Sequence, residues 1–262
     1  MADHVGSGSL LQCRSVVKKF GALAAVNDLS FEVRAGQVLG IGGPNGAGKT
    51  ALFDAISGVN PCTSGEIDFD GTRIERLLPD AVCHLGLART FQLNAGFDSL
   101  TVSDNIRVSC YFGGSKRVFP GIKFDKRTNE SVEEIIEFVG LQDFAHVKVK
   151  NLPVYYRKLL MIGASLARSP KLLMFDEPVG GLTPSEIEEV LKLIEKISAR
   201  KITIILIEHV MRFLIQLSDR VLILHRGERL FEGLPADILN DEKVIEVYLG
   251  EKTAKLLQRQ MS

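Results

Sequence analysis

The feature that most constrains this chain is the octapeptide Gly43-Pro44-Asn45-Gly46-Ala47-Gly48-Lys49-Thr50, which matches the pattern G-x-x-x-x-G-K-[ST] at every fixed position. An apolar run over 38–41 precedes it, so the pattern predicts a strand, a glycine-rich turn and a helix that begins near Lys49. Glycines let such a turn curve until several backbone N–H groups point inward, and the helix adds the positive end of its dipole. The segment therefore predicts a cradle for a polyphosphate.

Two residues of the octapeptide carry the chemistry expected of such a cradle. Lys49 is expected to reach the β- and γ-phosphates of a nucleoside triphosphate, and the Thr50 hydroxyl to bind the Mg²⁺ ion that bridges them. The alternative is an ordinary glycine-rich turn. Four fixed positions match by chance in only about one per cent of sequences of this length, which disfavours that alternative.

A pair of acidic residues follows a second apolar run in the segment Leu172-Leu173-Met174-Phe175-Asp176-Glu177. This segment has the form of a Walker B element and comes after the octapeptide in the expected order. Asp176 is predicted to hold Mg²⁺, directly or through water, and Glu177 to accept a proton from the water that attacks the γ-phosphate. A strand that ends in Asp-Glu-Pro is by itself more often the start of a solvated loop, and the upstream octapeptide reverses that preference.

Composition argues against several other classes of protein. Lys plus Arg and Asp plus Glu number 32 each, so the chain lacks the positive charge of a general nucleic-acid binder. The four cysteines form no C-x-x-C pair, which argues against a zinc site or a disulfide framework. No run of about eighteen apolar residues occurs, so the sequence predicts no membrane span. Its partners are expected to be proteins.

The order of predicted elements indicates an α/β domain interrupted by helices. The predicted strands are 29–33, 38–41, 66–69, 172–175, 202–207 and 221–224. Residues 1–9 are small and polar and are expected to be disordered. A helical insertion is predicted at about 93–167, the α/β pattern returns over 168–250, and 251–262 form a C-terminal tail.

Short-range signals predict several element ends. Asp70-Gly71 is typical of a two-residue hairpin turn. Ser131 with Glu134 is a candidate capping box for a helix that ends at Gly140. Thr183, with Pro184 and Glu186 after it, predicts the capped start of an amphipathic helix.

The order of these motifs resembles the ATP-binding cassette of ABC transporters over nearly the whole chain. Its parts are the octapeptide, Arg89-Thr90-Phe91-Gln92, Asp176-Glu177-Pro178 and Glu208-His209. Within that family, this chain resembles the branched-chain amino acid uptake group in the amino-acid sequence of four segments. These are Arg89-Thr90-Phe91-Gln92, Gly181-Leu182-Thr183-Pro184, Ile207-Glu208-His209 and Val247-Tyr248-Leu249-Gly250-Glu251. The resemblance implies one nucleotide-binding domain over 1–262. It would be a P-loop NTPase with a RecA-like core, an N-terminal antiparallel β-subdomain and an inserted α-helical subdomain.

The resemblance also assigns roles to single residues. Gln92 matches the glutamine that touches the metal and the attacking water beside the groove for the permease, although a lone glutamine is usually a surface residue. His209 matches the histidine that binds the γ-phosphate, against the alternative of a strand-end cap. Phe20 matches the aromatic residue that stacks on adenine, with Val26 beside it, and the alternative for Phe20 is a core aromatic.

One motif departs from the family. Where the family has a signature close to Leu-Ser-Gly-Gly-Gln, this chain has Leu152-Pro153-Val154-Tyr155-Tyr156. In the family, the serine and glycines offer a hydroxyl and N–H groups to the γ-phosphate of ATP on the opposite subunit. Proline, valine and tyrosine are expected to remove these donors and to crowd the phosphate. A head-to-tail heterodimer with a second cassette that carries an intact signature is therefore expected.

The resemblance implies an ATPase subunit that drives uptake of branched-chain amino acids or related small polar solutes. It would bind ATP and Mg²⁺ and lie peripherally at the cytoplasmic face of the cell membrane. Its expected partners are the second cassette, two permease subunits and, indirectly, a periplasmic or extracellular solute-binding protein. No nucleic-acid partner is expected.

Two other functions stay open at the level of sequence. The altered signature favours a non-hydrolysing regulatory subunit, which the intact Lys49, Asp176, Glu177 and His209 oppose. A soluble ABC protein acting on DNA or ribosomes is opposed by the neutral charge and the single P-loop. A P-loop GTPase is disfavoured because no Asn-Lys-x-Asp segment is present.

Overall fold

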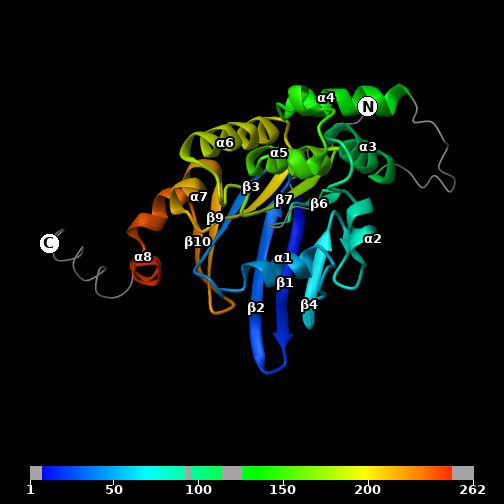
Figure 1. Ribbon diagram of the computed structural model, residues 1–262. Coiled ribbons are helices and arrows are strands. Elements are labelled where there is room, and N and C mark those ends of the chain that lie inside the picture. The colour runs from blue at the N-terminus through cyan, green and yellow to red at the C-terminus, as the bar shows by residue number, and fades with distance from the viewer. Residues whose placement is uncertain (1–7, 92–95, 114–125, 250–262) are drawn as a thin grey trace.

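The P-loop helix lies between two β-sheets in the described part of the chain (Figure 1). The structure is a computed structural model that describes residues 8–91, 96–113 and 126–249. The first sheet is antiparallel, in the order β2-β1-β4-β5. Its strands are β1 (Ser9–Phe20), β2 (Leu23–Arg34), β4 (Ser64–Phe69) and β5 (Thr72–Arg73).

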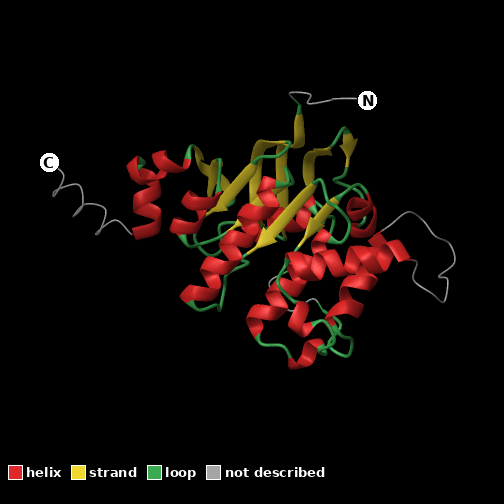
Figure 2. Cartoon of the chain, turned by 90° about the horizontal axis from the view of Figure 1, so that it is seen from above, coloured by secondary structure: helices red, strands yellow, loops and turns green. Residues whose placement is uncertain are grey.

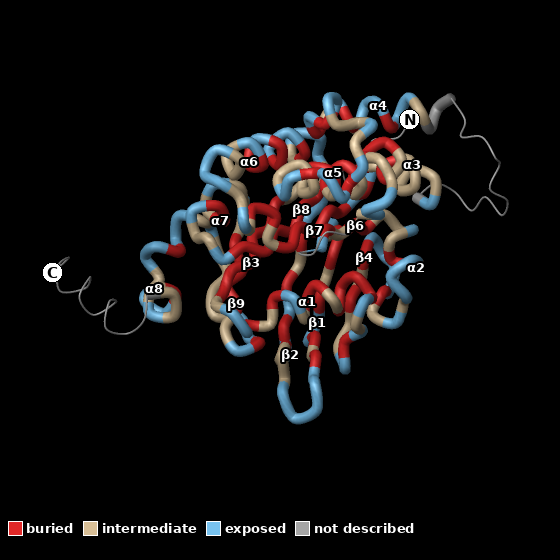
Figure 3. Tube along the Cα trace, viewed as in Figure 1, coloured by how far each residue is buried: buried red, intermediate tan, exposed pale blue. Residues whose placement is uncertain are grey.

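The second sheet carries the chemistry-bearing segments at its strand ends. Its order is β10-β9-β3-β8-β7-β6, and neighbouring strands are parallel except for β10 against β9. These strands are β3 (Val38–Gly42), β6 (Leu87–Arg89), β7 (Leu172–Asp176), β8 (Thr203–Ile207), β9 (Arg220–His225) and β10 (Glu228–Gly233). Every residue of β3, β7 and β8 is buried, as expected for parallel strands covered on both faces (Figure 3).

Helices complete the layers on both faces of the second sheet. On one face, α1 (Lys49–Ile56) packs with strands of both sheets in one hydrophobic cluster. On the other face, α6 (Pro184–Ala199) contributes Val190, Leu191 and Ile194 to a second cluster that also holds Leu173 and Leu206. The remaining α-helices are α2 (Pro79–His84), α7 (Met211–Leu217), α8 (Glu242–Leu249) and the three of the insertion.

The insertion consists of α3 (Val102–Gly113), α4 (Lys126–Phe138) and α5 (Val154–Leu166), grouped beside the sheets (Figures 1 and 2). It follows β6 and precedes β7, and these two strands are parallel neighbours with Leu87 opposite Leu172. The inserted helices thus sit within one crossover of an α/β core, in agreement with the predicted fold class. No helix among the described residues is long and apolar enough to cross a membrane.

Local patterns predicted several turns and caps, but β1, β5, β6 and β10 were not predicted and β2 begins six residues earlier than expected. Thr183 and Glu186 form the predicted capping box of α6, and Asp70 and Gly71 form the predicted hairpin turn with positive φ values of 51° and 77°. The expected disorder of 1–9 is wrong at Ser9, which begins β1, while residues 1–7 lie outside the described ones.

The capping box predicted at Ser131 and Glu134 is also wrong, because α4 already begins at Lys126. Ser131 lies inside this helix, five residues after its first residue, so it is not the N-cap. Its predicted end is confirmed, since Gly140 has a φ of 76° and its N–H donates to the Glu137 carbonyl oxygen at 3.1 Å.

Candidate nucleotide-binding site

The turn between β3 and α1 is an open, glycine-lined loop. Gly48 occupies the N-cap of α1 with a φ of 102°, where a Cβ would be strained and would overlap the carbonyl oxygen of Ala25. At Gly46, with a φ of 78°, a Cβ would meet no heavy atom within 4 Å, and both Asn45 and Gly46 are exposed. The loop is therefore packed tightly against the protein on one side and open to solvent on the other, as a phosphate cradle requires.

Lys49 holds its charge inside this loop. Its Nζ donates to the carbonyl oxygens of Gly43 at 2.7 Å and Pro44 at 3.0 Å, and the side chain is buried. Burial lowers the pKa of Lys49 below its ordinary value, and the nearby carboxylates of Glu177 and Asp176 oppose that shift. The ammonium group and the two predicted acids thus belong to one electrostatic cluster.

Asp176 ends β7, and its carboxylate is held by Arg89, for which the sequence motifs predicted no role. Arg89 of β6 donates to Asp176 Oδ2 at 2.9 Å and pairs with Asp54 Oδ1 of α1 at 2.6 Å. The guanidinium is nearly buried and also lies over the Phe53 ring. Arg89 therefore ties the Walker B strand to the P-loop helix. β6 has only three residues and shows no hydrophobic periodicity, so the local sequence did not predict the ion pair of Arg89 with Asp176.

Two predicted catalytic side chains meet because β7 and β8 are parallel neighbours. Asp176 is in register with Ile207, so the residues that follow these strands lie at one sheet edge. Glu177 Oε1 lies 3.9 Å from His209 Nδ1, and both side chains are partly exposed. A carboxylate and an imidazole at this edge can accept a proton from water and donate a hydrogen bond to a phosphate oxygen.

The predicted Mg²⁺ ligands provide hard oxygen donors. Asp176 offers a carboxylate, and Thr50 offers a hydroxyl exposed on the first turn of α1. Within the described ranges, no group of three or more His, Cys, Asp or Glu side chains could hold a metal by itself. This set fits Mg²⁺, which is commonly bound through one or two carboxylates together with substrate phosphates and water. The third predicted ligand, Gln92, lies outside the described residues.

The two residues predicted at the adenine end differ in exposure. Phe20, at the end of β1, is 47% exposed, and Lys18 Nζ lies 5.1 Å from the centre of its ring. The alternative of a core aromatic is thus not observed, and stacking on adenine stays a prediction. The placement of Val26 beside the base is wrong, because its side chain is 0% exposed and belongs to the core cluster between the sheets. The alternation of β2 turns Val26 inward at this position.

The segment at the signature position forms the start of α5. Pro153 is the N-cap and makes no side-chain capping bond, and Leu152 is buried. Val154 is 53% exposed, whereas the Tyr156 ring packs on Phe144 with centroids 4.0 Å apart. The expectation that Tyr156 crowds a phosphate is therefore revised, because its ring fills space within the insertion. Val154 is the apolar side chain presented at the start of this helix.

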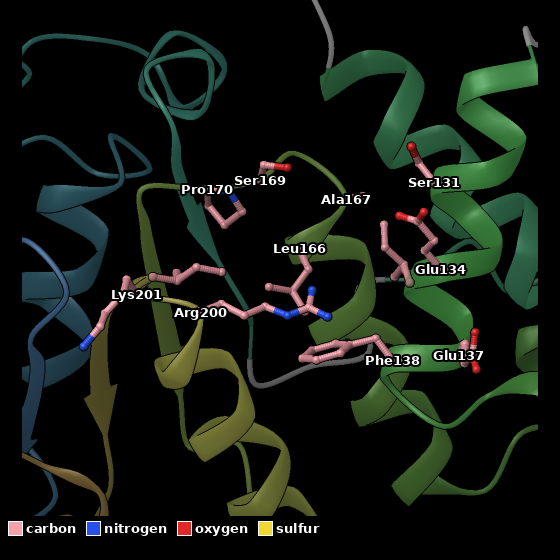
Figure 4. A pocket seen from close by; sticks show the side chains of 12 residues that line it. Ser131, Glu134, Glu137, Phe138, Leu166, Ala167, Ser169, Pro170, Arg200 and Lys201 are labelled. Atoms are coloured by element: carbon pink, nitrogen blue, oxygen red, sulfur yellow. The ribbon is translucent and has the colours of Figure 1, made fainter. Parts of the chain in front are cut away.

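A large cavity in the described structure is separate from the P-loop. It has a volume of about 710 Å³ and lies between α4 of the insertion and the C-terminal ends of α5 and α6 (Figure 4). Arg200 spans it, with its guanidinium carbon 3.6 Å from the centre of the Phe138 ring. None of the residues predicted to bind nucleotide lines this cavity.

The glycine-lined loop, the buried Lys49, the acids after β7 and the inserted helices define a P-loop nucleotide-binding protein of the cassette type. The family model described as ABC transporter matches residues 26–180, and a model described as Branched-chain amino acid ATP-binding cassette transporter matches residues 228–254. The chain belongs to the ABC transporter family, as the sequence resemblance predicted. Its site is accordingly that of an ATPase.

Similar proteins extend this likeness to nearly the whole chain. It is 33% identical over 253 residues to the high-affinity branched-chain amino acid transport ATP-binding protein LivG of Salmonella typhimurium, covering 94% of this chain and 99% of the relative. It is 32% identical, with the same coverage, to BraF of Pseudomonas aeruginosa, which has the same description. The crystal structure of the ADP conformation of MJ1267, an ATP-binding cassette of an ABC transporter, superposes with a TM-score of 0.84 at 28% identity and covers 94% of this chain and 100% of that one.

Proposed function

We propose that this chain is the ATP-hydrolysing subunit of a transporter that takes up branched-chain amino acids or related small polar solutes. The observation that carries the proposal is the likeness to LivG and BraF over 94% of the chain, including the separate match at 228–254. Two permease subunits would be its membrane partners, with a solute-binding protein on the outer side. The chain would then lie peripherally at the cytoplasmic face of the membrane.

At the site, each residue is proposed to act through the group it already presents. Lys49 binds the β- and γ-phosphates, and the octapeptide backbone wraps them. Glu177 accepts the proton of the attacking water, and His209 donates a hydrogen bond to the γ-phosphate. Thr50 and Asp176, with Gln92, would hold Mg²⁺, which neutralises charge on the phosphates when bound. Phe20 stacks on the adenine.

We further propose that the chain works as a heterodimer with a second cassette whose signature is intact. Support comes from α5, whose first turn begins with Pro153 and an exposed Val154. A homodimer would present this turn to both nucleotides. Proline has no N–H to donate, and Val154 offers no hydroxyl, so both sites would be poorly completed.

Uptake into proteoliposomes tests the proposed function. The complex of this chain with its permeases and second cassette would be reconstituted with ATP inside, and entry of labelled leucine measured in the presence of the binding protein. Lys49→Ala is expected to abolish uptake, because it removes the cation beside the β- and γ-phosphates. Lys192→Ala, on the exposed face of α6, is the matched control and should transport like the wild type. Uptake that persists in Lys49→Ala would contradict the proposal.

A further inference from the structure

The backbone turn that carries Glu177 is strained. Glu177 has a φ of 50°, in the left-handed region that is unfavourable for a residue with a Cβ. Such conformations persist when the surrounding structure over-determines them. The N–H of Glu177 donates to Ile207 at 3.0 Å, and Pro178 has no N–H. The Glu177 carbonyl oxygen accepts a hydrogen bond from the Gly180 N–H at 3.3 Å and can accept a second one, since a carbonyl oxygen has two lone pairs. Side chains can therefore help to hold two polar groups of the turn, the carbonyl of Glu177 and the N–H of Val179.

Lys158 reaches the first of these groups from the helical insertion. It lies on α5, one turn after Val154, and its Nζ donates to the Glu177 carbonyl oxygen at 3.3 Å. Burial lowers the pKa of Lys158, and the carboxylates of Glu208 and Glu177 oppose that shift. The desolvation of a half-buried lysine must be offset by nearby polar or charged groups, and here the Glu177 carbonyl accepts a hydrogen bond while the two carboxylates favour the charge electrostatically.

Glu208 reaches the second group from the end of β8. Its side chain is 1% exposed, and Oε1 accepts a hydrogen bond from the Val179 N–H at 3.4 Å. Among the described residues, Oε2 has no hydrogen-bond partner, and it lies 3.9 Å from His209 Nδ1. A buried carboxylate with one oxygen that lacks a hydrogen-bond partner destabilises the core. Its position beside Glu177 and His209 therefore suggests a role in the site.

We propose that Lys158 and Glu208 are positioning residues that hold the turn of Glu177 from both sides. Lys158 binds the carbonyl before Pro178, and Glu208 binds the N–H after it, so the general base keeps its left-handed backbone. Because Lys158 belongs to α5, any displacement of the first turns of that helix is transmitted to Glu177. The Lys158 ammonium group thus links α5, which begins at the signature position, to the Glu177 turn of the same chain.

The first test separates rate from affinity in the assembled transporter complex. Lys158→Met is expected to lower kcat for ATP about tenfold with KM unchanged, because the turn loosens while the P-loop stays intact. Lys158→Arg keeps a donor and should restore most of the rate. The control Lys192→Met removes an exposed lysine of α6 and should leave kcat unchanged. Rates are expressed per bound nucleotide, so partial unfolding does not mimic the effect. Wild-type kcat in Lys158→Met would overturn the proposal.

The second test needs only the full-length chain and no activity. Hydrogen exchange at the Val179 amide should accelerate roughly fivefold or more in Glu208→Leu, which removes the acceptor. Glu208→Gln keeps an amide oxygen and should exchange like the wild type at this amide. Amides of β7 and β8 report whether the core is intact in each variant. An unchanged rate at Val179 in Glu208→Leu, with the core protected, would also overturn the proposal.

Discussion

The exposed ring of Phe20 is available for stacking on a nucleotide base. Its ring is half exposed at the tip of the β1–β2 hairpin, where Leu23 is its cross-strand partner. If the ring stacks on adenine, Phe20→Ala should weaken ATP binding by roughly 1–2 kcal/mol and leave the chemical step almost unchanged, because stacking is a ground-state contact. Equilibrium titration with a fluorescent ATP analogue measures this. Leu23→Ala, at the same tip, is the control, and equal affinity in both variants would argue against stacking.

Glu208 is expected to make the free energy of unfolding depend on pH. Burial raises the pKa of Glu208 from 4.5 to about 7 in the folded chain, with Glu177 adding to the shift and the Val179 and His209 backbone and Lys158 opposing it. Between these pH values the folded state holds a proton that the unfolded state has lost. The stabilising contribution is therefore complete below pH 4.5 and is lost as the pH rises through 7, by up to about 3 kcal/mol.

Urea unfolding at pH 5 and pH 8 checks this sign. The wild-type free energy of unfolding should fall between the two pH values by more than that of Glu208→Gln, whose amide does not titrate. Other titrating groups contribute to both proteins and cancel in the comparison. The same pH dependence in both proteins would show that Glu208 is not the group responsible.

Helix-level contacts connect the insertion to the core. The Arg200 guanidinium, just after α6, lies over the Phe138 ring at the end of α4 (Figure 4). We expect Arg200→Ala to lower the free energy of unfolding by about 0.5–1 kcal/mol, as for an exposed cation–π contact. Lys196→Ala is the matched control, since it also removes a cation near the C-terminal end of α6 and makes no cation–π contact with a ring in the described part of the chain. Denaturant unfolding of both variants measures the difference, and equal losses would leave the ring contact without a role.

We expect the two nucleotide sites of the proposed heterodimer to differ in activity. Each ATP of a head-to-tail cassette pair would be completed by the α5 start of the opposite subunit, and this chain offers Pro153 and Val154 there. We therefore expect the ATP on this chain's Lys49 and Glu177 to be hydrolysed, completed by the partner's intact signature, and the other ATP to turn over slowly.

The test places the Walker B glutamate-to-glutamine change in one subunit at a time. Glu177→Gln should remove most ATPase activity of the complex while nucleotide affinity is retained, because an amide cannot accept the water's proton. The same change in the partner should have little effect. Loss of activity only with the partner variant would favour the regulatory function for this chain, and a functional homodimer would contradict the asymmetry.

Much of the site was predictable because its signals lie within a few residues of one another. The P-loop depends on glycines spaced along one turn, and the start of α6 depends on Thr183 and Glu186, three positions apart. Both patterns act through local backbone geometry, which a single sequence displays. The order of the motifs then specified the cassette fold and its helical insertion.

Tertiary structure alone decided which distant groups meet. The ion pair of Arg89 with Asp176 joins residues 87 positions apart and exists because β6 and β7 are in register. The contacts of Lys158 and Glu208 with the Glu177 turn depend on how α5 and β8 approach β7. The burial of Val26 was likewise set by the layers around it. Such pairings follow from strand register and helix packing, which sum weak contacts over the whole core, so no local pattern encodes them.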